Sequence, residues 1–117
     1  MAGLPGSYQR YDVPGLRRVL DAYRGITRDD LRVRLADFLR AVVPTAAEVG
    51  VRLCIHPDDP PRPLFGLPRV VSNEDDIAFL LDAVDAHENG LTLCTGSLGA
   101  GATNGLPAIA RRFAGRT

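Results

Sequence analysis

Residues 51–56 read Val51-Arg52-Leu53-Cys54-Ile55-His56, with an apolar side chain at every second position. This alternation predicts a β-strand that buries one face and carries polar or reactive groups on the other. Gly50 directly precedes the strand, and glycine at that place is typical of the left-handed end of a helix. We therefore expect a helix to end at Gly50 and a strand to begin at once.

The same order of elements occurs again further along the chain. Ser72, followed by Asp75 three residues later, predicts the start of a helix, and apolar residues recur at helical spacing up to Val84. We expect Asn89-Gly90 to close this helix. Leu91-Thr92-Leu93-Cys94-Thr95 then alternates as the first strand does, which predicts a second strand.

The N-terminal half contains two further helical patterns. Breaker residues, including Gly3-Leu4-Pro5-Gly6 and Val13-Pro14-Gly15, predict little structure before Leu16. Leu16 to Tyr23 shows helical spacing and should end at Gly25. A longer helix should follow. Thr27 and Asp30 form a capping box at its start, apolar residues from Leu31 to Val43 form its stripe, and Pro44 should kink it near its end.

The order of helices and strands predicts a parallel α/β sheet. A glycine-rich loop over residues 96–105 and a last helix from Leu106 to Phe113, stopped by Gly115, complete the pattern. Aliphatic residues share one strand face, and the opposite face carries polar or reactive ones, which favours a barrel over an open doubly wound sheet. We predict one α/β domain, a partial (β/α) TIM-type barrel with about two parallel strands and flanking helices. Its parts are residues 1–26 (loop and short helix), 27–72 (helix, strand and proline-rich loop) and 73–117 (helix, strand, glycine-rich loop and helix).

Composition excludes several classes of function. The 117 residues carry 14 basic and 14 acidic side chains, so the net charge is zero and neither nucleic acid nor a membrane is expected as a partner. No lysine is present, which excludes a Walker phosphate loop and Schiff-base chemistry. Without a recognisable targeting or membrane segment, we expect a cytoplasmic protein whose two cysteines stay reduced.

His56 and Cys94 each follow the apolar part of a predicted strand. Neighbouring parallel strands lie about 4.8 Å apart, so both side chains can reach one ion, and imidazole and thiolate suit iron, manganese or zinc. On spacing alone, a core histidine and a buried thiol are the more ordinary explanation of the pattern. We expect Cys54 to fill the core and His87 to be a solvated surface residue.

The run His56-Pro57-Asp58-Asp59-Pro60-Pro61-Arg62-Pro63 is the most specific feature of the chain. Prolines restrict a loop to few conformations, so Asp58 and Arg62 are preorganised for a polar ligand. The alternative is a stiff connector with locally paired carboxylates. Ser97, in the glycine-rich loop, is the third residue that we expect to contact a substrate.

These motifs resemble the mannonate dehydratase family. The resemblance rests on the proline-rich run from His56 to Pro63, on Cys94-Thr95-Gly96-Ser97 and on the separation between them, and it extends more faintly over nearly the whole chain. Asn104-Gly105-Leu106 departs from the family's Asn-Asp-Leu, which should weaken a helix cap. We found no residue to assign as catalytic.

The resemblance implies a carbon–oxygen lyase that converts D-mannonate to 2-dehydro-3-deoxy-D-gluconate in hexuronate breakdown, with Fe(II) or Mn(II) as cofactor. It implies His56 and Cys94 as metal ligands. In the family, further ligands and a catalytic histidine come from later motifs, a His-Leu-Arg strand end and an Asp-His pair, so the isolated chain is expected to lack a complete site and to form a homo-oligomer. The alternatives are an inactive truncated remnant that at most binds metal or self-associates, and another metal-dependent sugar barrel such as an isomerase.

Overall fold

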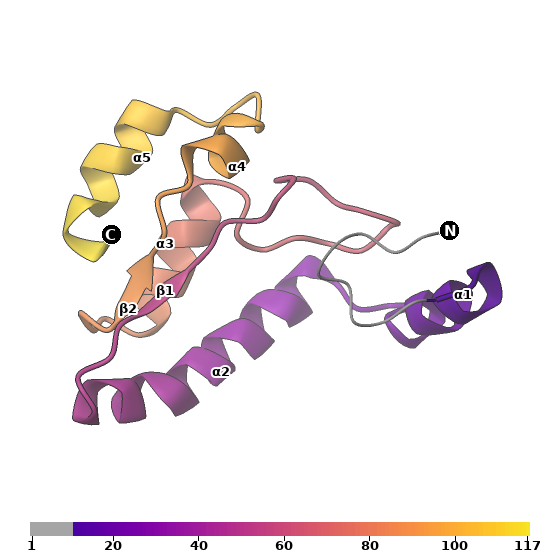
Figure 1. Cartoon of the computed structure of the whole chain (residues 1–117), viewed down its shortest axis with the longest axis horizontal. Helices are drawn as coiled ribbons and strands as arrows, with labels where there is room; N and C mark the ends of the chain where they lie inside the picture. The colour runs from indigo at the N-terminus through magenta and orange to yellow at the C-terminus, as the bar shows by residue number, and fades with distance from the viewer. Residues whose placement is uncertain (1–10) are drawn as a thin grey trace.

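The computed structural model describes residues 11–117, so the loop expected at Gly3-Leu4-Pro5-Gly6 lies outside the described residues. None of the helices in the described part has the length and apolar character needed to cross a membrane. The elements occur in the order α1 (Val13–Ala22), α2 (Arg28–Glu48), β1 (Leu53–Ile55), α3 (Glu74–Ala83), β2 (Asn89–Leu91), α4 (Thr95–Gly99), α5 (Leu106–Phe113) and the 3₁₀ turn η1 (Ala114–Arg116) (Figure 1).

The two strands are parallel, as the sequence predicts, with Cys54 opposite Gly90. Helices α2, α3 and α5 contribute to one hydrophobic core on one face of this small sheet, which is formed by Leu39, Val43, Val71, Ile77, Leu80, Leu81, Leu91, Leu98, Ile109 and Phe113. Leu53 and Ile55 pack against that core, whereas Cys54 and His56 on the other face are exposed. The division of the first strand into an apolar and a reactive face is therefore confirmed. The expectation that Cys54 fills the core was wrong, because Cys54 lies on the exposed face of the strand, opposite that core.

Helix α1 begins three residues earlier than expected. The Asp12 carboxylate accepts a hydrogen bond from Gly15 N at 2.7 Å, and Pro14 lies in the first turn, where its missing N–H costs nothing. The expectation that Val13-Pro14-Gly15 breaks the chain was wrong, because the same residues favour the start of a helix. In Figure 1, α1 projects away from the strands at the end opposite to α5.

Helix α2 carries the predicted capping box. The Thr27 hydroxyl accepts from Asp30 N at 3.1 Å, and the Asp30 carboxylate accepts from Thr27 N at 2.8 Å. The pKa of Asp30 is lowered, first by the hydrogen bond from the Thr27 hydroxyl at 2.7 Å and next by the one from Thr27 N. The helix continues through Pro44 to Glu48, and Gly50 then adopts a φ of 68°, so the predicted left-handed stop is confirmed.

Helix α3 begins and ends differently from the prediction. Its N-cap is Asn73, whose side chain accepts from Asp76 N at 3.0 Å, and not Ser72. It ends at Ala83, and Asn89 lies inside β2 instead of closing the helix. The Asn89 amide donates to Leu80 O at 2.9 Å and Val84 O at 3.0 Å, so a tertiary contact satisfies carbonyls at the end of α3.

Strand β2 therefore spans Asn89–Leu91 and not the predicted residues 91–95. Gly90 is required there because an added Cβ would lie 2.9 Å from Arg116 O and 3.0 Å from the Cys54 sulfur. Residues 95–99 form the short helix α4, where we expected a flexible loop. Helix α5 ends at Phe113, and Gly115 lies inside η1 instead of stopping α5.

Candidate active site

His56 directly follows β1 and is exposed, at the end of the sheet from which the proline-rich loop departs. Its Nδ1 lies 2.7 Å from the Pro57 carbonyl oxygen and donates to it. With the proton on Nδ1, Nε2 of the neutral ring keeps its lone pair for another partner. The residue that follows His56 thus fixes the tautomer of the ring.

Cys94 lies three residues beyond the end of β2 and is the N-cap of α4. Its sulfur accepts hydrogen bonds from the Ser97 hydroxyl at 3.1 Å and from Ser97 N at 3.5 Å. The Ser97 side chain is buried, with 2% of its surface exposed. The turn that begins α4 therefore fixes the sulfur in place.

The His56 and Cys94 side chains interact with each other. The pKa of Cys94 falls to about 7, mainly because Ser97 donates to the sulfur and further because the imidazole is near. The pKa of His56 is raised, first by the hydrogen bond to Pro57 and next by the Cys94 side chain, with a smaller contribution from Asp59. Imidazole and sulfur meet at the ends of two neighbouring parallel strands.

Asp58 faces into the proline-rich loop. Its carboxylate accepts hydrogen bonds from Val71 N at 2.8 Å and the Ser72 hydroxyl at 2.9 Å, and it pairs with Arg69 at 3.4 Å. These partners lie 11 to 14 residues ahead in the chain, so Asp58 ties the beginning of the loop to its end. Its predicted contact with a substrate stays a prediction.

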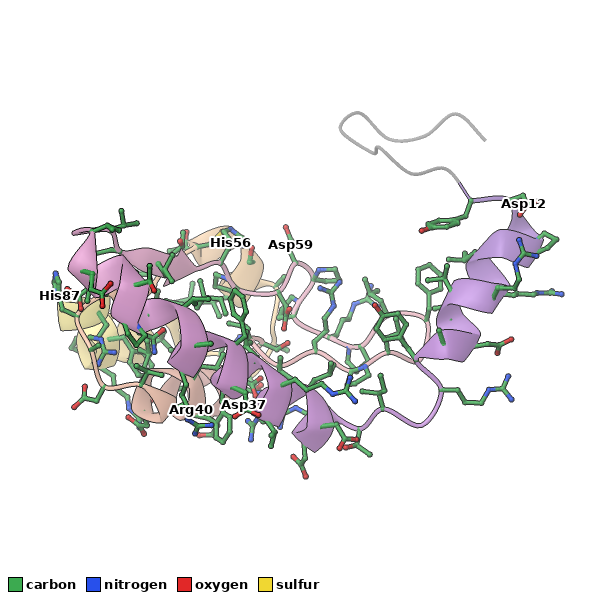
Figure 2. The ribbon with its side chains drawn as sticks, turned by 90° about the horizontal axis from the view of Figure 1, so that it is seen from below. Asp12, Asp37, Arg40, His56, Asp59 and His87 are labelled. Atoms are coloured by element: carbon green, nitrogen blue, oxygen red, sulfur yellow. The ribbon has the colours of Figure 1, made fainter. Side chains whose placement is uncertain are left out.

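Asp59 is the carboxylate that stands beside His56. Both side chains are exposed, and Figure 2 shows them on the same side of the molecule, with His87 far from them at one end. From the sequence we chose Asp58 and not Asp59 as a site residue, because the direction of each side chain depends on how the loop folds back onto residues 71 and 72. Arg62 lies further along the loop and is exposed.

We did not expect a role for Asp76 from the sequence. This carboxylate is fully buried and accepts from the guanidinium groups of Arg28 and Arg32 and from Ser72 N at 3.0 Å. It joins the first turns of α2 to the end of the loop that carries Asp58. The available signal was an acidic residue next to the apolar stripe of the helix. A carboxylate buried there requires hydrogen-bond or ion-pair partners.

Among the described residues, no group of three or more His, Cys, Asp or Glu side chains is placed to hold a metal ion. His56 and Cys94 alone supply one nitrogen and one sulfur. These donors suit a divalent transition metal, but stable sites use about four to six ligands. The donor set therefore fits part of a metal site.

Comparison with known proteins gives consistent results. A mannonate dehydratase of Rhizobium meliloti is 54% identical over 98% of this chain, and mannonate dehydratase 1 of Agrobacterium fabrum is 56% identical over 98%. The crystal structure of mannonate dehydratase from Streptococcus suis superposes on 91% of the chain with a TM-score of 0.81 and 33% identity.

The chain spans 29% of the length of each of the two relatives and 31% of the chain in the crystal structure. The sequence model of the D-mannonate dehydratase (UxuA) family matches residues 1–117. The motifs, the parallel strands and these similarities agree, and the chain belongs to the D-mannonate dehydratase (UxuA) family.

Proposed function

We propose that this chain forms the part of a mannonate dehydratase that carries two ligands of its metal, His56 and Cys94. The reaction is the removal of water from D-mannonate to give 2-dehydro-3-deoxy-D-gluconate, within hexuronate breakdown in the cytoplasm. The observation that carries the proposal is the meeting of an imidazole and a sulfur of lowered pKa at neighbouring strand ends in a chain of this family.

The family resemblance implies Fe(II) or Mn(II) as the metal, and one imidazole and one thiolate are compatible with a divalent transition metal. Bound there, the metal would polarise the substrate carboxylate and acidify the adjacent C–H. Since two donors are too few, further ligands would complete the site. We further propose that the two strands belong to a TIM-type barrel, in which reactive residues gather at the carboxyl ends of the strands.

The proline-rich loop supports binding of a sugar acid. Arg62 is exposed there, and a guanidinium matches the geometry of a carboxylate with two parallel hydrogen bonds. Asp58 ties the beginning of the loop to its end through Val71 and Ser72. In this proposal Arg62 binds the substrate carboxylate, and Asp58 positions the loop.

A chimera tests the proposal. Residues 1–117 would replace the matching segment of the Rhizobium meliloti relative, to which they are 54% identical. We expect the chimera to dehydrate D-mannonate in the presence of Mn(II), and both His56→Ala and Cys94→Ala to abolish turnover and lower the bound Mn(II). The matched controls are His87→Ala and Cys54→Ala, which should leave both measurements unchanged. Equal metal content in all variants would remove His56 and Cys94 from the site.

The alternative is an inactive remnant that at most binds metal or self-associates. The observation that favours it is an uncovered apolar groove of about 380 Å³ between α2 and β1, where Phe38 is 58% exposed. The two functions differ in the chimera, which a remnant would leave inactive. For the isolated chain both predict no turnover, so a rate of mannonate dehydration that rises with Mn(II) would contradict our view that the site is incomplete.

A further inference from the structure

We infer that Ser97 is a positioning residue for the Cys94 sulfur, and not a residue that contacts the sugar acid. The inference rests on the proposed metal site and concerns how this chain prepares its sulfur donor. It replaces the role expected for Ser97 from the sequence, which assumed that the glycine-rich segment is an open loop.

Ser97 and the residue after it are both buried. Ser97 is 2% exposed, and Leu98 is fully buried in the core. Leu98 N donates to Cys94 O at 3.1 Å, which closes the first turn of α4. Because Leu98 anchors this turn, the Ser97 side chain is held beneath the surface, where a bound sugar acid has little access to it.

Ser97 directs two hydrogen-bond donors at the Cys94 sulfur. The Ser97 hydroxyl has one proton, and it points to the Cys94 sulfur at 3.1 Å, while Ser97 N approaches the same sulfur at 3.5 Å. Both donors therefore lie on one side of the sulfur. The His56 imidazole interacts with the same atom, so Ser97 and His56 together determine where the remaining lone pairs of the sulfur point.

The consequence for metal binding follows from the chemistry of thiolates. Hydrogen bonds to a ligating sulfur reduce the charge that it donates to a metal, and they fix its orientation. Loss of such a partner commonly weakens metal binding by about tenfold or more. His56 has the equivalent support from the Pro57 carbonyl, so each donor is held by a group close to it in sequence.

The test uses Co(II) and the chimera described above, in which the rest of the relative can supply the further ligands, because a cobalt–thiolate bond gives a sulfur-to-metal charge-transfer absorption band. We expect the unsubstituted chimera to show the band, Cys94→Ala to lose it, and Ser97→Ala to shift it to lower energy with about tenfold weaker Co(II) binding. Ser97→Thr keeps the hydroxyl and should restore both the band position and the affinity. Far-ultraviolet circular dichroism of each variant checks that α4 and the rest of the fold persist.

The outcomes separate the inference from the proposed function. An unsubstituted chimera without a charge-transfer band overturns the metal site itself, and the role of Ser97 with it. A band of the chimera that Ser97→Ala leaves unchanged in position and affinity overturns only the positioning role. Loss of D-mannonate binding by the cobalt-loaded chimera on Ser97→Ala, with the band unmoved, would return Ser97 to the role of a substrate contact.

Discussion

At the scale of single residues, the site depends on hydrogen bonds between near neighbours in sequence. Pro57 accepts from His56, and Ser97 donates to Cys94. Short sequence separation lets each contact form within a single turn, although Leu98 in the core holds the turn that contains Ser97. The immediate partner of each donor is therefore local, and the meeting of the two donors is a tertiary property.

The lowered pKa of Cys94 predicts its reactivity in the metal-free chain. With a chelator present and Cys54 replaced by Ala, the rate of alkylation by iodoacetamide should rise with pH around a midpoint of about 7, because the thiolate is the nucleophile. Ser97→Ala should move the midpoint upward, and by more than His56→Ala, since the Ser97 hydroxyl makes the largest contribution to the lowered pKa. Mass spectrometry of quenched samples measures the rate, and a midpoint that neither substitution moves would contradict this account of the shift.

At the scale of elements, a buried ion-pair cluster and a close strand contact join segments far apart in sequence. Asp76 links α3 to Arg28 and Arg32 of α2, and Gly90 brings β2 against both β1 and η1. The salt bridge between Arg112 and Glu74, in contrast, is largely exposed. These contacts should therefore differ in what they contribute to the free energy of unfolding.

Asp76→Ala should lower the free energy of unfolding by about 3 kcal/mol, because it leaves two guanidinium groups near the core without their carboxylate. Glu74→Ala is the matched control on the same helix and should cost less than about 1 kcal/mol, since exposed ion pairs contribute little. Urea denaturation followed by circular dichroism measures both values. An equal loss of unfolding free energy in the two variants would show that the buried ion pairs of Asp76 contribute no more than the exposed pair of Glu74.

Gly90→Ala should cost about 1 to 3 kcal/mol, because its Cβ would approach the Arg116 carbonyl and the Cys54 sulfur to 3.0 Å or less. Gly99→Ala is the control. Its Cβ would meet Leu106 at an ordinary 3.4 Å, and alanine favours a helix, so stability should be unchanged or slightly higher. Thermal unfolding measures the stability of both variants. A Gly90→Ala variant as stable as the wild type would mean that η1 does not pack closely against β2.

At the scale of the whole molecule, the described chain leaves an apolar strip uncovered along α2 and the outer edge of β1. Two neighbouring grooves of about 380 and 370 Å³ share Val42 and Leu53 in their walls. Phe38 and Val51, which line them, are 58% and 49% exposed. Such a strip is unusual on a monomer and favours association.

We therefore expect the isolated chain to self-associate as its concentration rises. Phe38→Asp should shift the equilibrium toward monomer, because it places a charge in the groove. Val33→Asp introduces the same charge on the same helix at an exposed position that lines neither groove, and it should have little effect. Sedimentation velocity over a range of concentrations measures the association, and a wild-type chain that stays monomeric throughout would rule it out.

The sequence by itself determined the parallel α/β order, the capping box at Thr27, the stop at Gly50 and the motifs that identify the family. These features depend on residues that lie within a few positions of one another, so local sequence is sufficient for them. Tertiary structure decided the rest. The start of β2 at Asn89 depends on carbonyls at the end of α3, the direction of Asp58 depends on Val71 and Ser72, and the burial of Ser97 depends on Leu98 entering the core. For Asn89 and Asp58 the reason is a hydrogen-bond partner beyond the reach of helical or strand periodicity, and for Ser97 it is the packing of Leu98 in the core; the spacing of residues along the chain reveals neither.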